Sequence, residues 1–89
     1  MAPRTSAVNA FPEQEESLRA LWERLLGSPV VEKSNFFLCG GDSLAGALLL
    51  EQIHAHFSVR LNLIVLYRYP TFGQFAAYLA AELNQRPAN

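Results

Sequence analysis

The sequence has little cysteine, and this limits the chemistry available to the protein. Its 89 residues contain one cysteine, Cys39, so no disulfide can form within the chain and no second thiol can complete a thiolate metal site. We interpret Cys39 as a small buried apolar residue and not as a reactive thiol. A lone thiol is typical of the reducing cytoplasm, which is the location we expect.

An excess of charge and long apolar runs are also missing. The formal net charge is −1, and neither half of the chain carries the basic stripe of a nucleic-acid binder. No apolar run is long enough to span a membrane, and the N-terminus lacks the apolar region of a signal peptide. We therefore expect neither a nucleic-acid partner nor a membrane partner.

Hydrophobic residues, in contrast, are plentiful. They make up 51% of the chain, which argues against disorder, and 89 residues suffice for one domain with a modest core. Such a length is short for an enzyme that has to enclose a cleft. We expect a folded domain over residues 11–84, with tails at residues 1–10 and 85–89.

The spacing of the apolar residues predicts helices. Residues 12–26 carry apolar side chains at i, i+3, i+4, i+7 and i+8, a pattern typical of one buried helical face. Further helices are expected over residues 43–57, over the short segment 63–67, and from Thr71 to about residue 83, where Thr71 and Gln74 have capping-box spacing. The sequence shows no strand alternation. It therefore predicts an all-α four-helix bundle with three long helices and one short one, in which Trp22 and Phe75 belong to the core.

A long loop precedes the second helix and ends in a glycine pair. Loops of the length of residues 28–42 are usually functional in a small domain. Two adjacent glycines, Gly40 and Gly41, permit a sharp turn, and Asp42 is a favoured N-cap residue. The hydroxyl of Ser43 should therefore lie at a helix N-terminus, where the dipole and free N–H groups favour an anion. The apolar residues that we expect to anchor the loop are Val30, Val31, Phe36, Phe37 and Leu38.

Three kinds of chemistry compete for Ser43. The first is nucleophilic catalysis, because residues 41–44 spell the Gly-Asp-Ser-Leu block of the GDSL hydrolases. However, no Asp-x-x-His follows, and His54 and His56 would lie roughly 16 to 20 Å down the helix. The second is a purely structural role in which Asp42 or Ser43 only caps the helix, which leaves the glycine pair unexplained. The third is covalent modification of the hydroxyl.

A family resemblance favours the third possibility. The stretch Asn35-Phe36-Phe37-Leu38-Cys39-Gly40-Gly41-Asp42-Ser43-Leu44 resembles the attachment signature of the phosphopantetheine-dependent carrier proteins. Within them it is most similar to the peptidyl carrier, or thiolation, domains of nonribosomal peptide synthetases. The similarity covers about residues 12–83 and includes Val30-Val31, Leu61-x-Leu63 and the segment 66–72.

The resemblance implies an acyl-carrier-like bundle in which Ser43 is the attachment site of 4′-phosphopantetheine. A phosphopantetheinyl transferase would place the arm on its hydroxyl from coenzyme A with a magnesium ion. Gly40, Gly41 and Asp42 would complete the cofactor-binding residues, with the two glycines leaving room for the transferase. The carrier would bind no metal of its own, since His54 and His56 have no third ligand.

The implied function is that of a non-catalytic, monomeric peptidyl carrier protein. Its arm would hold an aminoacyl, peptidyl or aryl group as a thioester and present it to an adenylation enzyme and to condensation or tailoring enzymes. The alternative is an acyl carrier of polyketide or fatty-acid synthesis. Many of these are acidic along the second helix, whereas this helix has Glu51 as its one acid, which favours the peptidyl class.

The second helix has two apolar faces. One of them, expected to be core, consists of Gly46, Leu49, Leu50, Ile53 and Phe57. The other is either buried as well or exposed as a sticky patch. We expect it to dock partner proteins through Leu44, Ala47 and Leu48, together with Leu66 and Tyr67 from the short helix.

Overall fold

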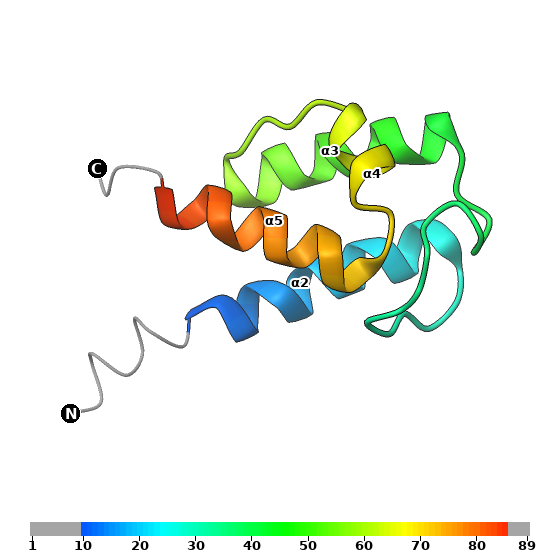
Figure 1. Ribbon diagram of the computed structural model, residues 1–89, viewed down its shortest axis with the longest axis horizontal. Helices are drawn as coiled ribbons and strands as arrows, with labels where there is room; N and C mark the ends of the chain where they lie inside the picture. The colour runs from blue at the N-terminus through cyan, green and yellow to red at the C-terminus, as the bar shows by residue number, and fades with distance from the viewer. Residues whose placement is uncertain (1–9, 86–89) are drawn as a thin grey trace.

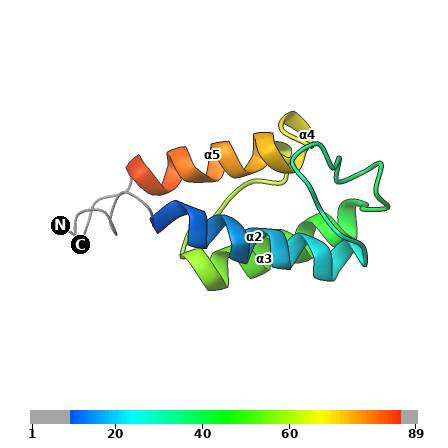
Figure 2. The same cartoon turned by 90° about the horizontal axis from the view of Figure 1, so that it is seen from below.

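The computed structural model describes residues 10–85. In this range it contains α2 (Ala10–Leu26), α3 (Ser43–Phe57), α4 (Ile64–Arg68) and α5 (Phe72–Gln85), joined by loops (Figure 1). Helices α3 and α5 both run antiparallel to α2, and the short α4 lies beside the first half of α3. The loop between α2 and α3 covers the same end of the bundle as α4 (Figure 2). The predicted all-α fold with three long helices and one short one is confirmed.

The helix bounds differ from the predicted ones only at the ends. Helix α2 begins at Ala10, two residues before Pro12. Proline is tolerated in the first turn because the N–H groups of that turn have no intrahelical acceptor, so the N–H group that proline lacks is not needed. Helix α5 continues to Gln85, since the first helix-breaking residue after it is Pro87. The remaining predicted tail residues, 1–9 and 86–89, lie outside the described residues. None of the four helices is long and apolar enough to cross a membrane.

The core is organised around an aromatic cluster. The indole of Trp22 on α2 meets the rings of Phe36 and Phe72 edge-on at centroid distances of 5.1 and 5.2 Å, and Phe75 lies 5.8 Å away. All four side chains are fully buried. Edge-to-face pairs of this kind add to the stabilisation that comes from burial alone. The cluster therefore joins α2, the α2–α3 loop and α5 in one core, and the core assignments of Trp22 and Phe75 are confirmed.

Backbone hydrogen bonds join the α2–α3 loop to the start of α5. The N–H of Phe36 donates to Pro70 O (2.8 Å), and the N–H groups of Phe72 and Gly73 donate to Ser34 O and Glu32 O (2.8 and 2.9 Å). The predicted capping box also forms, with the N–H of Gln74 donating to Thr71 Oγ1 at 3.3 Å. Residues 32–36 of the loop are thus held against the start of α5 although they form no helix.

Only part of the expected loop anchor is buried. Val30 and Phe36 lie in the core, and Phe37 packs against it, but Val31 and Leu38 are 62% and 86% exposed. The expectation for Val31 and Leu38 is wrong because the loop folds into tight turns. Asn35 Oδ1 accepts hydrogen bonds from the N–H groups of Phe37 and Leu38, and this turn directs Phe36 inward and Leu38 outward.

Candidate functional site

The site is built on the first turn of α3. Asp42 has an extended backbone, its Oδ1 accepts a hydrogen bond from the N–H of Ala45 at 2.9 Å, and its carbonyl accepts one from Gly46 at 2.8 Å. This confirms Asp42 as the N-cap residue. Ser43 is therefore the first residue of α3, and it is exposed. The N–H groups of Ser43 and Leu44 have no intrahelical acceptor at this position and can serve an anion.

The two glycines before Asp42 have different roles. Gly40 has a φ of +103° and no atom within 4 Å of where a Cβ would lie, so it makes the turn and borders open space. Gly41 faces inward, since a Cβ there would overlap the Phe36 ring and lie 2.7 Å from the Phe36 carbonyl oxygen. The expectation that both glycines leave room for an incoming enzyme therefore holds sterically only for Gly40. Gly41 instead allows the backbone just before Ser43 to pack directly against the buried Phe36 ring.

Helix α4 contributes a second hydroxyl to the site. The Oη of Tyr67 lies 3.0 Å from Ser43 Oγ, which is hydrogen-bond distance. The Tyr67 ring is stacked on Phe37 at a centroid distance of 4.7 Å and an interplanar angle of 12°. The sequence carries no signal for this contact, because the two residues are 24 positions apart and no local pattern links them.

The two helices that carry Ser43 and Tyr67 also expose apolar side chains. On α3, Leu44 and Leu48 are 70% and 43% exposed, and Ala47 between them is exposed as well. On α4, Ile64 and Tyr67 are 53% and 49% exposed. We call these five residues the apolar face. Of the two alternatives for this side of α3, burial is therefore wrong and exposure is right.

The expectation for Leu66 is wrong and Ile64 was missed. Leu66 is fully buried and cannot contact a partner. The reason is the helical period, which turns Val65 and Leu66 toward the core and places Ile64 and Tyr67, three residues apart, on the outer side. That i, i+3 spacing was the signal in the sequence that could have identified Ile64.

Cys39 is exposed, so its interpretation as a buried residue is wrong. Its N–H donates to Asn35 O at 2.9 Å within the turn, whose inner side is occupied by Phe36. The turn that buries Phe36 thus leaves the Cys39 side chain exposed.

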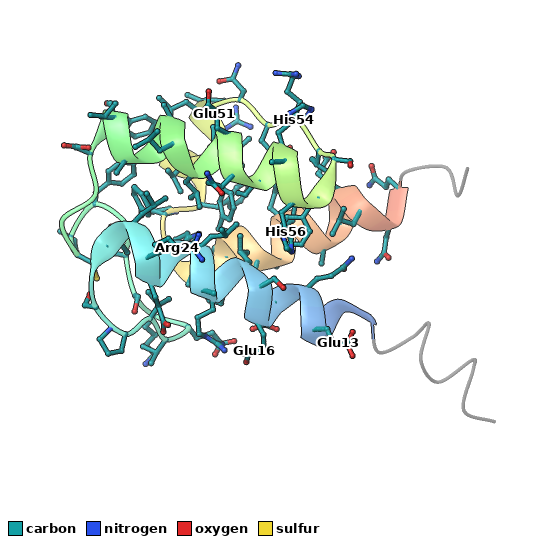
Figure 3. The ribbon with its side chains drawn as sticks, turned by 180° about the vertical axis from the view of Figure 1, so that it is seen from behind. Glu13, Glu16, Arg24, Glu51, His54 and His56 are labelled. Carbon is teal, nitrogen blue, oxygen red and sulfur yellow. The ribbon has the colours of Figure 1, made fainter. Side chains whose placement is uncertain are left out.

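The described side chains include no partner for nucleophilic catalysis at Ser43. His54 and His56 belong to the last turns of α3, at the end away from the α2–α3 loop (Figure 3), and both are exposed. Residues 10–85 also contain no group of three or more His, Cys, Asp or Glu side chains arranged to hold a metal ion. The arrangement thus offers an accessible hydroxyl at a helix N-terminus, next to a phenol and an apolar face, and no base to activate it.

Comparison with known proteins identifies relatives over most of the chain. The family described as phosphopantetheine attachment site matches residues 16–79. Pyochelin synthetase PchE from Pseudomonas aeruginosa (strain UCBPP-PA14) is 38% identical over 78 residues, which are 86% of this chain and 5% of the synthetase. The chain thus spans a small fraction of the length of that relative.

Solved structures show the same fold. The solution structure of an active-site mutant peptidyl carrier protein superposes with a TM-score of 0.76 at 34% identity, covering 91% of this chain and 88% of the other. A chain from the complex of the phosphopantetheine transferase Sfp with coenzyme A and a peptidyl carrier protein gives a TM-score of 0.70 at 38% identity, covering 75% and 88%.

Proposed function

This chain belongs to the phosphopantetheine-attachment family and is a non-catalytic peptidyl carrier whose cofactor is 4′-phosphopantetheine, and we propose that Ser43 carries the arm. The observation that supports this assignment best is the position of its hydroxyl. It belongs to an exposed residue at the N-terminus of α3, with no described base nearby, and therefore suits modification by another enzyme better than catalysis.

The residues around Ser43 fit a phosphodiester. The free N–H groups of Ser43 and Leu44 and the α3 dipole favour a negative charge there. Asp42 acts indirectly, because its carboxylate is engaged with the N–H of Ala45 and fixes the start of the helix. Gly40 leaves open space for the approach of coenzyme A, while Gly41 keeps the site packed on Phe36.

Attachment is a substitution at phosphorus in which the carrier supplies one oxygen. Ser43 Oγ forms a bond to the phosphorus next to the pantetheine of coenzyme A, and the bond from that phosphorus to the bridging oxygen breaks. Adenosine 3′,5′-bisphosphate leaves, and the proton of the serine hydroxyl is released. The described hydrogen bonds place only the Tyr67 phenol next to Ser43 Oγ, so we assign removal of this proton to the transferase. The bound arm supplies a terminal thiol that holds the cargo as a thioester.

The partners follow from this chemistry. A phosphopantetheinyl transferase loads the arm, an adenylation enzyme supplies the activated cargo, and condensation or tailoring enzymes consume it. We further propose that the protein acts as a monomer in the cytoplasm, where coenzyme A is available and the arm thiol stays reduced. Neither nucleic acid nor a membrane is required for any of these steps.

The assignment is tested by loading the unmodified chain with coenzyme A, magnesium and a transferase of broad specificity. We expect the intact mass to increase by one phosphopantetheine and tandem mass spectrometry to locate the addition on Ser43. An unchanged mass, or an addition on Ser34 or Ser58, would contradict the proposal. Hydrolysis of simple esters by the purified chain would instead support the hydrolase alternative.

We propose that the apolar face docks the partner enzymes. Leu48→Glu places a charge on this face, and burying that charge against an apolar partner surface is unfavourable. Turnover by an adenylation or condensation enzyme that accepts the wild-type carrier should fall by about tenfold or more at subsaturating carrier, equivalent to roughly 1.4 kcal/mol.

Ala81→Glu is the matched control for Leu48→Glu, because it adds the same charge at an exposed position on α5, outside the apolar face. It should leave turnover unchanged. Both variants should keep the wild-type melting temperature. A large decrease for Leu48→Glu would mean that the residue acts in the core, and docking through it would have to be abandoned.

A further inference from the structure

The hydroxyl of Tyr67 is placed to act on the attachment site. It lies 3.0 Å from Ser43 Oγ, and among the described residues it is the only side chain hydrogen-bonded to Ser43. The two groups come from different helices, α4 and α3, and both residues are exposed. A hydrogen bond between two neutral hydroxyls that water can reach contributes little to folding. The contact therefore does little to stabilise the unmodified protein, and we look for its role in the modified one.

The phenol is held in place from two sides. Its ring is stacked on Phe37, which in turn meets the fully buried ring of Phe36 edge-on at 5.5 Å. Helix α4 itself is pressed against α3 one turn after Ser43. A Cβ on Gly46 would lie 2.9 Å from Leu63 Cδ1 and 3.1 Å from Leu66 Cδ2, so these two leucine side chains pack closely over the glycine. The Tyr67 hydroxyl thus cannot leave the site without breaking the ring stack or moving α4.

Modification changes what the two oxygens can do. In the unmodified chain either hydroxyl can donate the hydrogen bond. Once Ser43 Oγ is bonded to phosphorus it has no proton, and the phosphodiester around it offers only acceptor oxygens with a negative charge. Tyr67 then becomes the donor. A hydrogen bond to a charged acceptor is roughly twice as strong as one between neutral groups.

We propose that Tyr67 is a positioning residue whose O–H donates a hydrogen bond to the phosphodiester formed on Ser43. This bond would fix the attached end of the arm and would tie α4 to α3 more strongly in the modified protein than in the unmodified one. This inference rests on the proposed attachment at Ser43. The hydrogen bond from Tyr67 reaches its full strength only in the protein that carries the arm. The holo form should consequently be stabilised relative to the apo form, and by more than the helix N-terminus alone provides.

Tyr67→Phe tests this because it keeps the ring that stacks on Phe37 and removes only the hydroxyl. Melting temperatures are measured for the apo and holo forms of the wild type and of the variant. For a domain of this size, loss of one such hydrogen bond should lower the holo-minus-apo difference by about 4–8 °C, with little change in the apo form. The ³¹P resonance of the holo variant should also move away from its wild-type position. Tyr69→Phe is the matched control, since its ring is stacked on Tyr78 and its hydroxyl has no described hydrogen bond to Ser43, and it should alter neither quantity.

The outcomes separate this inference from the proposed function. If the wild type acquires the arm on Ser43, but the melting difference and the ³¹P resonance are the same in Tyr67→Phe, then Tyr67 does not contact the phosphodiester and the inference is overturned while the attachment stands. If the arm cannot be attached, or is found on another residue, the proposed function fails and the inference fails with it.

Discussion

Ser43→Ala should abolish the mass increase that coenzyme A and a phosphopantetheinyl transferase produce on the wild-type chain. The expected loss is complete, because alanine has no oxygen to bond to phosphorus and no other described hydroxyl combines a helix N-terminus with the Gly40 opening. Alanine is a strong helix former, and the Ser43 side chain contacts only the exposed hydroxyl of Tyr67 among the described hydrogen bonds. The far-ultraviolet circular dichroism spectrum should therefore be unchanged.

Ser58→Gly is the control for Ser43→Ala. Ser58 caps the opposite end of α3 and has a φ of 60°, a conformation that glycine adopts without strain. This variant should gain the full phosphopantetheine mass. A residual addition on Ser43→Ala, mapped to any other residue, would show that the site has been misassigned even if the carrier function is right.

The second large effect is expected for Phe36→Ala. The Phe36 ring is fully buried, packs against Trp22 and forms the floor on which Gly41 lies. Removal of a buried phenylalanine side chain typically costs about 3–5 kcal/mol, which is a large part of the stability of a small domain. Denaturant unfolding followed by tryptophan fluorescence should show a strongly lowered midpoint, because Trp22 reports on the affected cluster.

Leu38→Ala provides the comparison within the same loop. Leu38 is 86% exposed, so shortening it should change the free energy of unfolding by no more than about 0.5 kcal/mol. The two variants thus compare a buried side chain, Phe36, with an exposed one, Leu38, two positions away in the same turn. Equal effects for both variants would mean that the loop is not folded on the core as described.

The helices and the helix cap were predictable because their signals are local. The start of α3 follows from Asp42 and the glycine pair, and the face of α2 follows from apolar spacing, so both were predicted within a few residues. The side-chain errors in the loop have a common cause. Whether Leu38 and Cys39 point in or out depends on a turn held by Asn35 and filled by Phe36, and no periodic pattern encodes such a turn.

Contacts between distant segments were equally inaccessible. The pairing of Tyr67 with Ser43 depends on how closely α4 approaches α3, and the side chains of Leu63 and Leu66 pack over Gly46 where the two segments meet. The burial of Leu66 depends on the same approach. The sequence therefore identified the candidate site residue, whereas the neighbour that most directly touches it emerged only from the packing of the helices.

The hydrogen bonds between the α2–α3 loop and the start of α5 have a mechanical consequence for delivery. They connect residues 32–36 to residues 70–73, and the N–H of Gly41 donates to Phe36 O at 2.8 Å, so the segment leading to Ser43 is anchored to the bundle. If Ser43 carries the arm, as we propose, the attachment point is stationary in the frame of the domain. The distance over which the cargo can move is then set by the length of the arm. To reach an enzyme beyond that distance, the whole carrier has to move as a rigid body.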